Sequence, residues 1–244
     1  MIKQAHFYWG NTTLPWLQSL SIRSFRKLHP DWVVNVYRSA TPCKYEAGPD
    51  FWSTIEGCTM WTVDVREMTG TSLDGYPDDS SWHHTAWSDG LRNDLLRRVG
   101  GVWSDVDVLW FDRADGSSLD GPGVRMLWTF GVSNGLIAAG ETGLPAFGRL
   151  CEHGRRISPA HQEPGGQSPF GPILWEEEFG GPAGVPDFHQ IDAHQFHEPP
   201  FTRAMHYRAA RVVWGSVTAA NWREKCAEVP GLVSGIERVL DVIG

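Results

Sequence analysis

The sequence lacks long apolar runs and clustered cysteines. No apolar run approaches the roughly 18 residues that a membrane helix needs, and the N-terminus carries no signal-peptide pattern. The four cysteines lie far apart and form no C-x-x-C pair, which disfavours a zinc site and a dense disulfide framework. These absences predict a chain without a membrane span, located in the cytoplasm.

Basic runs and phosphate-binding glycine motifs are also missing. The net charge is −8, and no basic run is available to neutralise a nucleic-acid backbone, so such binding is not expected. No G-x-G-x-x-G follows the first expected strand, which disfavours a dinucleotide cofactor, and no G-x-x-x-x-G-K-[ST] marks a P-loop. A bound diphosphate would therefore need another counter-charge.

The first residues predict a β-α-β unit. Gln4 to Trp9 has the character of a short buried strand, Leu14 to Leu28 that of a helix opened by Pro15, and Trp32 to Tyr37 that of a second strand. The chirality of such units implies parallel strands in one sheet. Further strands are predicted over Met60–Val65, Val124–Phe130, Val132–Ala139 and Phe188–Asp192, with helices over Leu144–Ile157 and along an apolar stripe from Leu232 to Ile243 that docks on the sheet.

The stretch from Trp87 to Trp110 predicts a helix, a stop and a strand. Trp87, Leu91, Leu95 and Val99 recur every four residues along one helical face. Ser88 is the expected cap of this helix, and Asp89 and Arg92, three residues apart, share a different face.

Gly100 and Gly101 can adopt the positive φ that ends a helix. Val102 to Phe111 then has the β-branched and aromatic character of a strand. Period-two alternation places Asp105 and Asp107 on one face of that strand.

Two carboxylates so close together at the end of an apolar strand need a cationic partner. Asp105 and Asp107 suit a hard ion such as Mn²⁺ or Mg²⁺, which keeps a few protein carboxylates and takes other ligands from substrate phosphates. The alternative is that the two aspartates pair with cations at a solvated strand end; the candidates are Arg97, Arg98 and Arg113.

The pattern S-D-x-x-R, helix, G-G-x-x-x-D-x-D resembles the DXD-containing glycosyltransferase family. This family includes the yeast outer-chain mannosyltransferases, bacterial capsular sugar transferases and the catalytic domains of clostridial glucosylating toxins. The resemblance implies that Asp89 and Arg92 bind a nucleotide-sugar donor and that Asp105 and Asp107 hold the metal on its diphosphate. The matching positions are Ser88, Asp89, Arg92, Gly100, Gly101, Asp105 and Asp107, whereas Gly90 and Trp103 replace an aliphatic residue and a tyrosine.

Four further positions resemble functional residues of that family, and each has a structural alternative. Trp9, in an aromatic-tryptophan-glycine turn, is expected to stack on the donor base or to plug the core under the sheet. Asn134 would reach the sugar, or serve as a turn residue before a glycine. His206, followed by Trp214, would lie near the metal and the diphosphate, or be a satisfied structural histidine.

The resemblance implies an α/β fold: a single GT-A-type nucleotide-diphospho-sugar transferase domain over residues 1–244, with a Rossmann-like mixed central sheet flanked by helices. Residues 1–111 would form the nucleotide-sugar and metal-binding half, and residues 112–244 the acceptor-side half with the C-terminal helix. The expected activity is metal-dependent hexosyl transfer, with retention, from a UDP- or GDP-sugar to a hydroxyl of a glycan, protein or other acceptor.

Two alternatives belong to other functional classes. An aspartate-nucleophile phosphatase also has a hydrophobic strand followed by D-x-D-V, but it needs a later lysine and a G-D-x-x-x-D cluster. After Asp107 the only lysine is Lys225, and no G-D-x-x-x-D occurs. A sugar- or nucleotide-binding module without turnover is the second alternative, with the aspartates holding a structural ion and some of the 13 tryptophans forming a platform.

Overall fold

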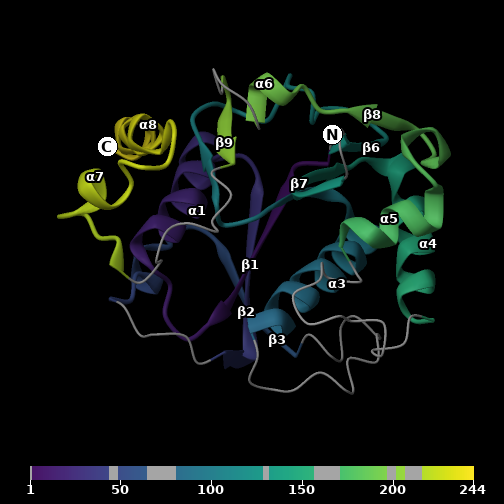
Figure 1. The fold of residues 1–244 in the computed structure, drawn as a ribbon, viewed down its shortest axis with the longest axis horizontal. Coiled ribbons are helices and arrows are strands. Elements are labelled where there is room, and N and C mark those ends of the chain that lie inside the picture. The colour runs from purple at the N-terminus through teal and green to yellow at the C-terminus, as the bar shows by residue number, and fades with distance from the viewer. Residues whose placement is uncertain are drawn as a thin grey trace.

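A mixed β-sheet forms the centre of the molecule in the computed structural model (Figure 1). The structure describes residues 2–43, 49–64, 81–128, 132–156, 171–196, 202–206 and 216–244. Within these ranges the main sheet has seven strands. In spatial order they are β3 (Thr59–Val63), β2 (Val33–Cys43), β1 (Gln4–Asn11), β4 (Gly101–Ser104), β7 (Val132–Ala139), β6 (Val124–Trp128) and β8 (Phe188–Gln190).

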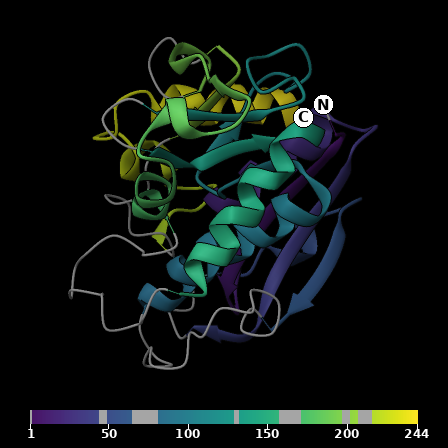
Figure 2. The same ribbon diagram turned by 90° about the vertical axis from the view of Figure 1, so that its right-hand side faces the viewer.

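Helices cover both faces of this sheet. The helix α1 (Trp16–Leu28) packs on one face, where the rings of Phe7 and Phe25 meet edge to face at 5.5 Å. The helix α3 (Ser81–Val99) packs on the other face, and α4 (Leu144–Gly154) and α5 (Pro172–Phe179) pack beside it. Figure 2 shows α4 nearest the viewer, with the sheet behind it.

The predicted β-α-β opening is confirmed. β1 and β2 pair in parallel from Gln4 opposite Val33 to Trp9 opposite Arg38, and α1 connects them. The helix starts at Trp16. Pro15 is therefore the N-cap residue, with an extended backbone, rather than the first residue of the helix. Because α1 starts where β1 ends, its first turn lies at the carboxyl edge of the parallel strands.

The helix and glycine stop before β4 form as predicted, with two corrections. Gly100 and Gly101 have φ values of +62° and +93°, the region that favours glycine. A Cβ at Gly101 would lie 2.5 Å from the carbonyl oxygen of Gln4, so the backbones of β4 and β1 need glycine to approach. The prediction that Ser88 caps the helix is wrong, because α3 starts at Ser81, and Val99 is 42% exposed rather than buried.

The predicted continuous strand from Val102 to Phe111 is wrong. β4 ends at Ser104, the chain turns, and β5 (Val108–Trp110) pairs with β9 (Ala204–His206) in a separate two-stranded sheet. The turn forms because the amide of Asp105 donates to the carbonyl of Gly135 at 2.7 Å and the amide of Val108 donates to the carbonyl of Asp105 at 3.2 Å. The D-x-D segment, residues 105–107, is therefore a turn where the chain leaves the main sheet.

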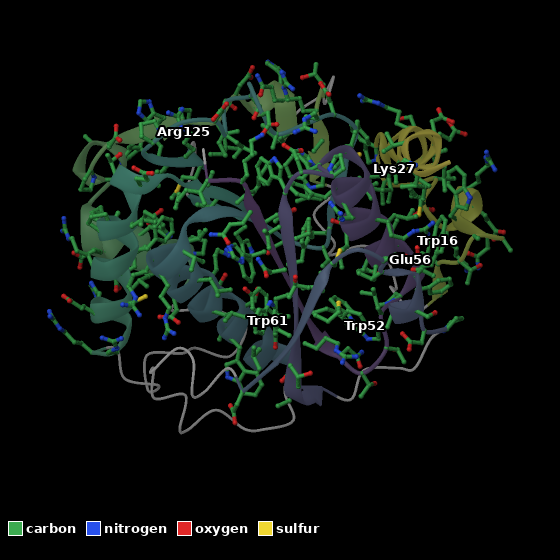
Figure 3. The ribbon with its side chains drawn as sticks, turned by 180° about the vertical axis from the view of Figure 1, so that it is seen from behind. Trp16, Lys27, Trp52, Glu56, Trp61 and Arg125 are labelled. Carbon is green, nitrogen blue, oxygen red and sulfur yellow. The ribbon has the colours of Figure 1, made fainter. Side chains whose placement is uncertain are left out.

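The C-terminal helix α8 (Leu232–Ile243) docks on α1 and β5 rather than on the main sheet, which corrects the prediction. Its buried residues join a second apolar cluster with Leu17 and Leu20 of α1 and Leu109 of β5. In α7 (Trp222–Lys225), the ring of Trp222 lies 6.4 Å from that of Trp16. Trp16 is labelled in Figure 3 near these two C-terminal helices.

The remaining elements agree in part with the predictions. The predicted hairpin is present as β6 and β7, which pair antiparallel, and the predicted strand at Phe188 is β8. The helix α5 was not predicted, and the helix predicted to Ile157 ends at Gly154. Short helices complete the description: η1 (Trp52–Thr54), η2 (Glu141–Gly143), η4 (Pro182–Gly184) and α6 (Ala193–Phe196). None of the helices in the described ranges is both long enough and apolar enough to cross a bilayer.

Two histidines are held neutral by burial, and both of their ring nitrogens have partners. Nε2 of His6 donates to the carbonyl of Gly100 at 3.0 Å, and its Nδ1 lies 3.1 Å from the hydroxyl of Tyr37. Nδ1 of His29 donates to the carbonyl of Phe25 at 2.8 Å, and its Nε2 accepts the amide of Ala114 at 2.7 Å. Burial lowers the pKa of each imidazole to about 4.

These histidines predict a loss of stability in mild acid. In an unfolded chain the imidazole pKa is about 6.5, so the unfolded state binds more protons below that pH. The stability contributed by each neutral histidine is present above pH ~6.5 and declines as the pH falls toward about 4, by at most ~1.4 kcal/mol per pH unit. Urea unfolding at pH 7 and pH 5 measures this difference.

His29→Gln serves as the matched variant for this prediction. It should have a shallower dependence of unfolding free energy on pH than the wild type, whatever its absolute stability. Equal unfolding free energies of the wild type at pH 7 and pH 5 would contradict the expectation.

Candidate active site

The D-x-D turn lies at the carboxyl edge of the parallel strands. β4 runs parallel to β1, so Asp105 follows β4 at the edge of the sheet where β1 also ends. The side chain of Asp105 is 32% exposed and that of Asp107 is half-buried, whereas Val106 and Val108 are buried. The expected alternation of burial therefore holds through the turn.

Arg92 of α3 links two aspartates at this edge. Its Nη2 lies 3.0 Å from Oδ1 of Asp89, one helical turn earlier, and 3.2 Å from Oδ1 of Asp105. The guanidinium stands 5.0 Å from the centroid of the Trp103 ring. The structure thus brings together Asp89, Arg92 and Asp105, three residues that the sequence singled out.

The guanidinium of Arg92 retains unused donors. Arg92 is only 2% exposed, and its Nε and Nη1 atoms have no hydrogen-bond partner in the part of the chain that the structure describes. Burying charged N–H groups without acceptors costs free energy, so such a group is suited to an anion that binds beside it. Planar guanidinium forks match the oxygen geometry of phosphates.

Trp103 contacts Asp105 and so belongs to the site, although the sequence did not assign it there. Its Nε1 donates to Oδ1 of Asp105 at 2.7 Å, the same oxygen that Arg92 approaches. The signal was present as a departure from the resembled family, in which a tyrosine occupies this position. The indole N–H of tryptophan is a hydrogen-bond donor, as the hydroxyl of tyrosine is, so it can orient the carboxylate of Asp105 in the same way.

The alternative cationic partners of the D-x-D aspartates bind other carboxylates. Arg97 and Arg98 both pair with the buried Asp94 of α3, at 2.6 and 2.9 Å. Arg113 pairs with Asp31 at 2.8 Å and with Asp115. Asp105 pairs instead with Arg92, the arginine of the S-D-x-x-R pattern.

The D-x-D carboxylates fit a hard divalent ion. Within the described ranges, no group of three or more His, Cys, Asp or Glu side chains gathers in a metal-ligating arrangement. Two neighbouring carboxylates suit Mg²⁺ or Mn²⁺, which bind through one or two carboxylates and complete their shell with waters and substrate phosphates. The donor set at Asp105 and Asp107 is therefore compatible with the predicted ion.

The backbone brings two more predicted residues to this edge. His206 ends β9 and pairs with Val108, the residue that follows Asp107. Asn134 lies in β7 and precedes Gly135, whose carbonyl accepts the amide of Asp105. The side chains of Asn134 and His206, and the whole of Trp214, lie outside the described residues.

Two indoles fix the loop that follows β1. Nε1 of Trp9 donates to the carbonyl of Thr13 at 2.7 Å, and Nε1 of Trp52 donates to the carbonyl of Thr12 at 2.9 Å. Trp9 is half-buried at the tip of β1, and Trp52 lies under the guanidinium of Arg38 at 5.3 Å. The ring of Trp9 is thus oriented at the carboxyl edge, and Trp52, which the sequence analysis did not single out, helps to hold the loop.

A groove of about 430 Å³ lies elsewhere, between α1, η1 and the end of α8. Lys27 and Glu56, both labelled in Figure 3, belong to its lining. It includes none of the residues that surround the D-x-D turn, so we treat it as separate from the candidate active site.

No protein-family model and no curated protein sequence matches this chain. Among solved structures, it is similar to the galactosyltransferase LgtC in complex with donor and acceptor sugar analogs, with 10% identity and a TM-score of 0.50 over 98% of this chain and 95% of that chain. An active-site mutant of LgtC gives 12% identity and a TM-score of 0.51 with the same coverage. The PaToxG glycosyltransferase gives 17% identity and a TM-score of 0.47 over 73% of this chain and 69% of that chain.

The likeness to LgtC establishes the fold. It extends over nearly the full length of both chains, and the mixed sheet flanked by helices is that of the GT-A glycosyltransferases. The predicted α/β class and GT-A architecture are therefore confirmed.

Proposed function

We propose that this protein is a metal-dependent glycosyltransferase that moves a hexose from a UDP- or GDP-sugar to an acceptor hydroxyl, with retention. The observation that carries the proposal is the buried guanidinium of Arg92, which pairs with Asp89 and Asp105 and has two N–H-bearing nitrogens without an acceptor among the described residues. The GT-A fold supports the same reading. Residues 1–244 would act as one domain, with the donor side in residues 1–111 and the acceptor side in residues 112–244.

Asp105 and Asp107 would hold Mn²⁺ or Mg²⁺ at the turn. When bound, the ion neutralises negative charge on the donor diphosphate. Arg92 would donate from Nε and Nη1 to oxygens of the leaving diphosphate and stabilise the charge that develops as the sugar departs. Trp103 would keep Asp105 oriented through its indole N–H.

Asp89 has two roles in this proposal. Its carboxylate fixes one side of the Arg92 fork, and it would also position hydroxyl groups of the donor sugar. Trp9 would stack on the base, Asn134 would reach the sugar, and His206 and Trp214 would approach the metal and the diphosphate. Positions of the backbone at β7 and β9 support the proposed roles of Asn134 and His206.

Nucleotide binding is expected to depend on a divalent metal. UDP or GDP at about 100 times its Kd should stabilise the fold by ~2.7 kcal/mol, a rise of several degrees in Tm, when Mn²⁺ is present. With EDTA the rise should be largely lost, because the sequence has neither of the glycine-rich phosphate-binding motifs considered above. Thermal unfolding with UDP and GDP, each with Mn²⁺ and with EDTA, measures both effects.

The same experiment on Asp107→Asn provides the control, since that variant should lose the metal-dependent part of the shift. Equal shifts with Mn²⁺ and with EDTA would count against the metal role. Metal-dependent binding without any turnover of a nucleotide sugar would favour the binding-module alternative.

A further inference from the structure

Gln18 of α1 is a buried amide whose hydrogen-bonding capacity is unused. Its side chain is 0% exposed, and neither Oε1 nor Nε2 has a partner among the residues that the structure describes. It lies on the sheet-facing side of α1, in line with Leu14, which precedes the helix, and with Ile22 and Phe25. All three are buried in the main core. An apolar side chain of similar size would suit this position better in the ligand-free protein.

Hydrogen bonds between α1 and β5 fix where Gln18 lies along the chain. The hydroxyl of Ser24 accepts the amide of Trp110 at 3.3 Å, and the hydroxyl of Ser21 donates to the carbonyl of Val108 at 2.6 Å. Residues nearer the start of α1 therefore lie beside residues nearer the start of β5, which follows the D-x-D segment. Gln18 lies one turn before Ser21, and side chains of a helix lean toward its N-terminus.

Extended by one more helical turn, the same register brings Gln18 to the level of the residues that precede Val108, where the D-x-D turn lies. It also lies in the first turn of α1, at the edge of the sheet where β1 ends. Gln18 is therefore the one polar member of a stripe that is otherwise formed by Leu14, Ile22 and Phe25.

The other polar residues on this side of α1 have partners. Ser21 and Ser24 bond to β5, and the hydroxyl of Ser19 donates to the carbonyl of Trp16 at 2.6 Å. A buried indole with an unused N–H, such as Trp175, gains its stability from the burial of a large ring. Gln18 gains much less in this way, because only two methylene groups of its side chain are apolar.

We infer that Gln18 is a positioning residue of the donor site, whose amide forms hydrogen bonds with the D-x-D turn when metal and nucleotide are bound. The inference rests on the proposed function. A carboxamide can donate to a carboxylate and accept from a backbone amide, the two kinds of group that a turn containing two aspartates presents. The ligand-free protein bears the cost of the unsatisfied amide, and the bound state removes it.

The test uses Gln18→Met, which keeps an unbranched side chain of similar length without the amide. In the absence of ligand, its Tm should be higher than that of the wild type. Its Kd for UDP or GDP with Mn²⁺, measured by titration calorimetry, should be about tenfold weaker, and KM for the donor should rise more than kcat falls. Gln18→Leu repeats the test with a second apolar side chain.

Ser24→Ala is the matched control on the same side of α1. It removes a hydroxyl that bonds to β5 one turn beyond Ser21, so its Tm should fall while its nucleotide affinity remains that of the wild type. This control separates a loosening of α1 against β5 from the specific role of the Gln18 amide.

Unchanged nucleotide affinity in Gln18→Met and Gln18→Leu would overturn the inference while leaving the proposed function in place. A lower Tm of both variants without ligand would also overturn it, because the amide would then have a partner in the ligand-free state. If the wild type binds neither UDP nor GDP with Mn²⁺, the proposed function fails, and the inference fails with it.

Discussion

Replacing Asp107 with asparagine is expected to lower turnover of the nucleotide sugar by about a hundred- to thousandfold while the fold is retained. The substitution keeps the shape of the side chain but removes the negative charge that would hold the divalent ion. Asp107 is half-buried in a turn whose backbone hydrogen bonds run through Asp105 and Val108, and the substitution leaves both of these bonds in place. Steady-state kcat and Tm, measured on the same preparation, test both parts.

Asp112→Asn is the matched control for this prediction. Asp112 lies five residues further along, where its carboxylate pairs with Arg203 at 3.1 Å on the surface. Its loss should leave turnover near the wild-type level. The account would be contradicted if Asp107→Asn lowered Tm substantially and retained turnover, because the carboxylate would then be structural.

Replacing Arg92 with lysine is expected to lower kcat/KM by about a hundredfold or more. The charge is kept, but a single ammonium group replaces the planar fork that reaches Asp89 and Asp105 and still has Nε and Nη1 available. The variant should also lose the stacking of the guanidinium over Trp103, which adds a modest decrease in Tm. Donor kinetics and thermal unfolding separate the two effects.

Arg98→Lys provides the comparison for Arg92→Lys. Arg98 pairs with Asp94 on the same helix at 2.9 Å, and its side chain is half-exposed. Its replacement should change neither kcat nor KM appreciably. A similar kcat/KM for Arg92→Lys and Arg98→Lys would show that the fork of Arg92 plays no part in transfer.

Local signals were enough to predict much of the fold. The β-α-β opening followed from short apolar runs separated by Pro15 and by the stop after Leu28, and the end of α3 followed from Gly100 and Gly101. The strand break at residues 105–107 could not be predicted, because Val102 to Phe111 is apolar or aromatic on both sides of the aspartates. The break depends on a contact with Gly135, which is distant in sequence.

The packing of α8 also depends on contacts between segments that are distant in sequence. Its apolar stripe predicted a buried face, but a stripe does not specify the surface that covers it. The structure buries that face on α1 and β5, together with residues such as Leu17 and Leu109. That surface exists because β5 belongs to a separate two-stranded sheet, which the sequence did not predict.

The candidate site was predictable where the residue spacing is distinctive. Asp89 and Arg92 come together because residues three apart on a helix share a face, and Asp105 reaches them because β4 lies beside α3. Gln18 could not be assigned from sequence, and Trp103 was marked there only as a departure from the tyrosine of the resembled family. Trp103 matters because it contacts Asp105, and Gln18 because its amide atoms have no hydrogen-bond partner among the described residues.

The most direct test of the account is a turnover screen of UDP- and GDP-sugars, in which the nucleoside diphosphate released is measured with Mn²⁺ and with EDTA. The account predicts release from at least one donor with Mn²⁺, loss of release with EDTA, and loss of release in Asp107→Asn. Release that persists equally with EDTA and in Asp107→Asn, or no release from any donor by the folded wild-type protein, would contradict it.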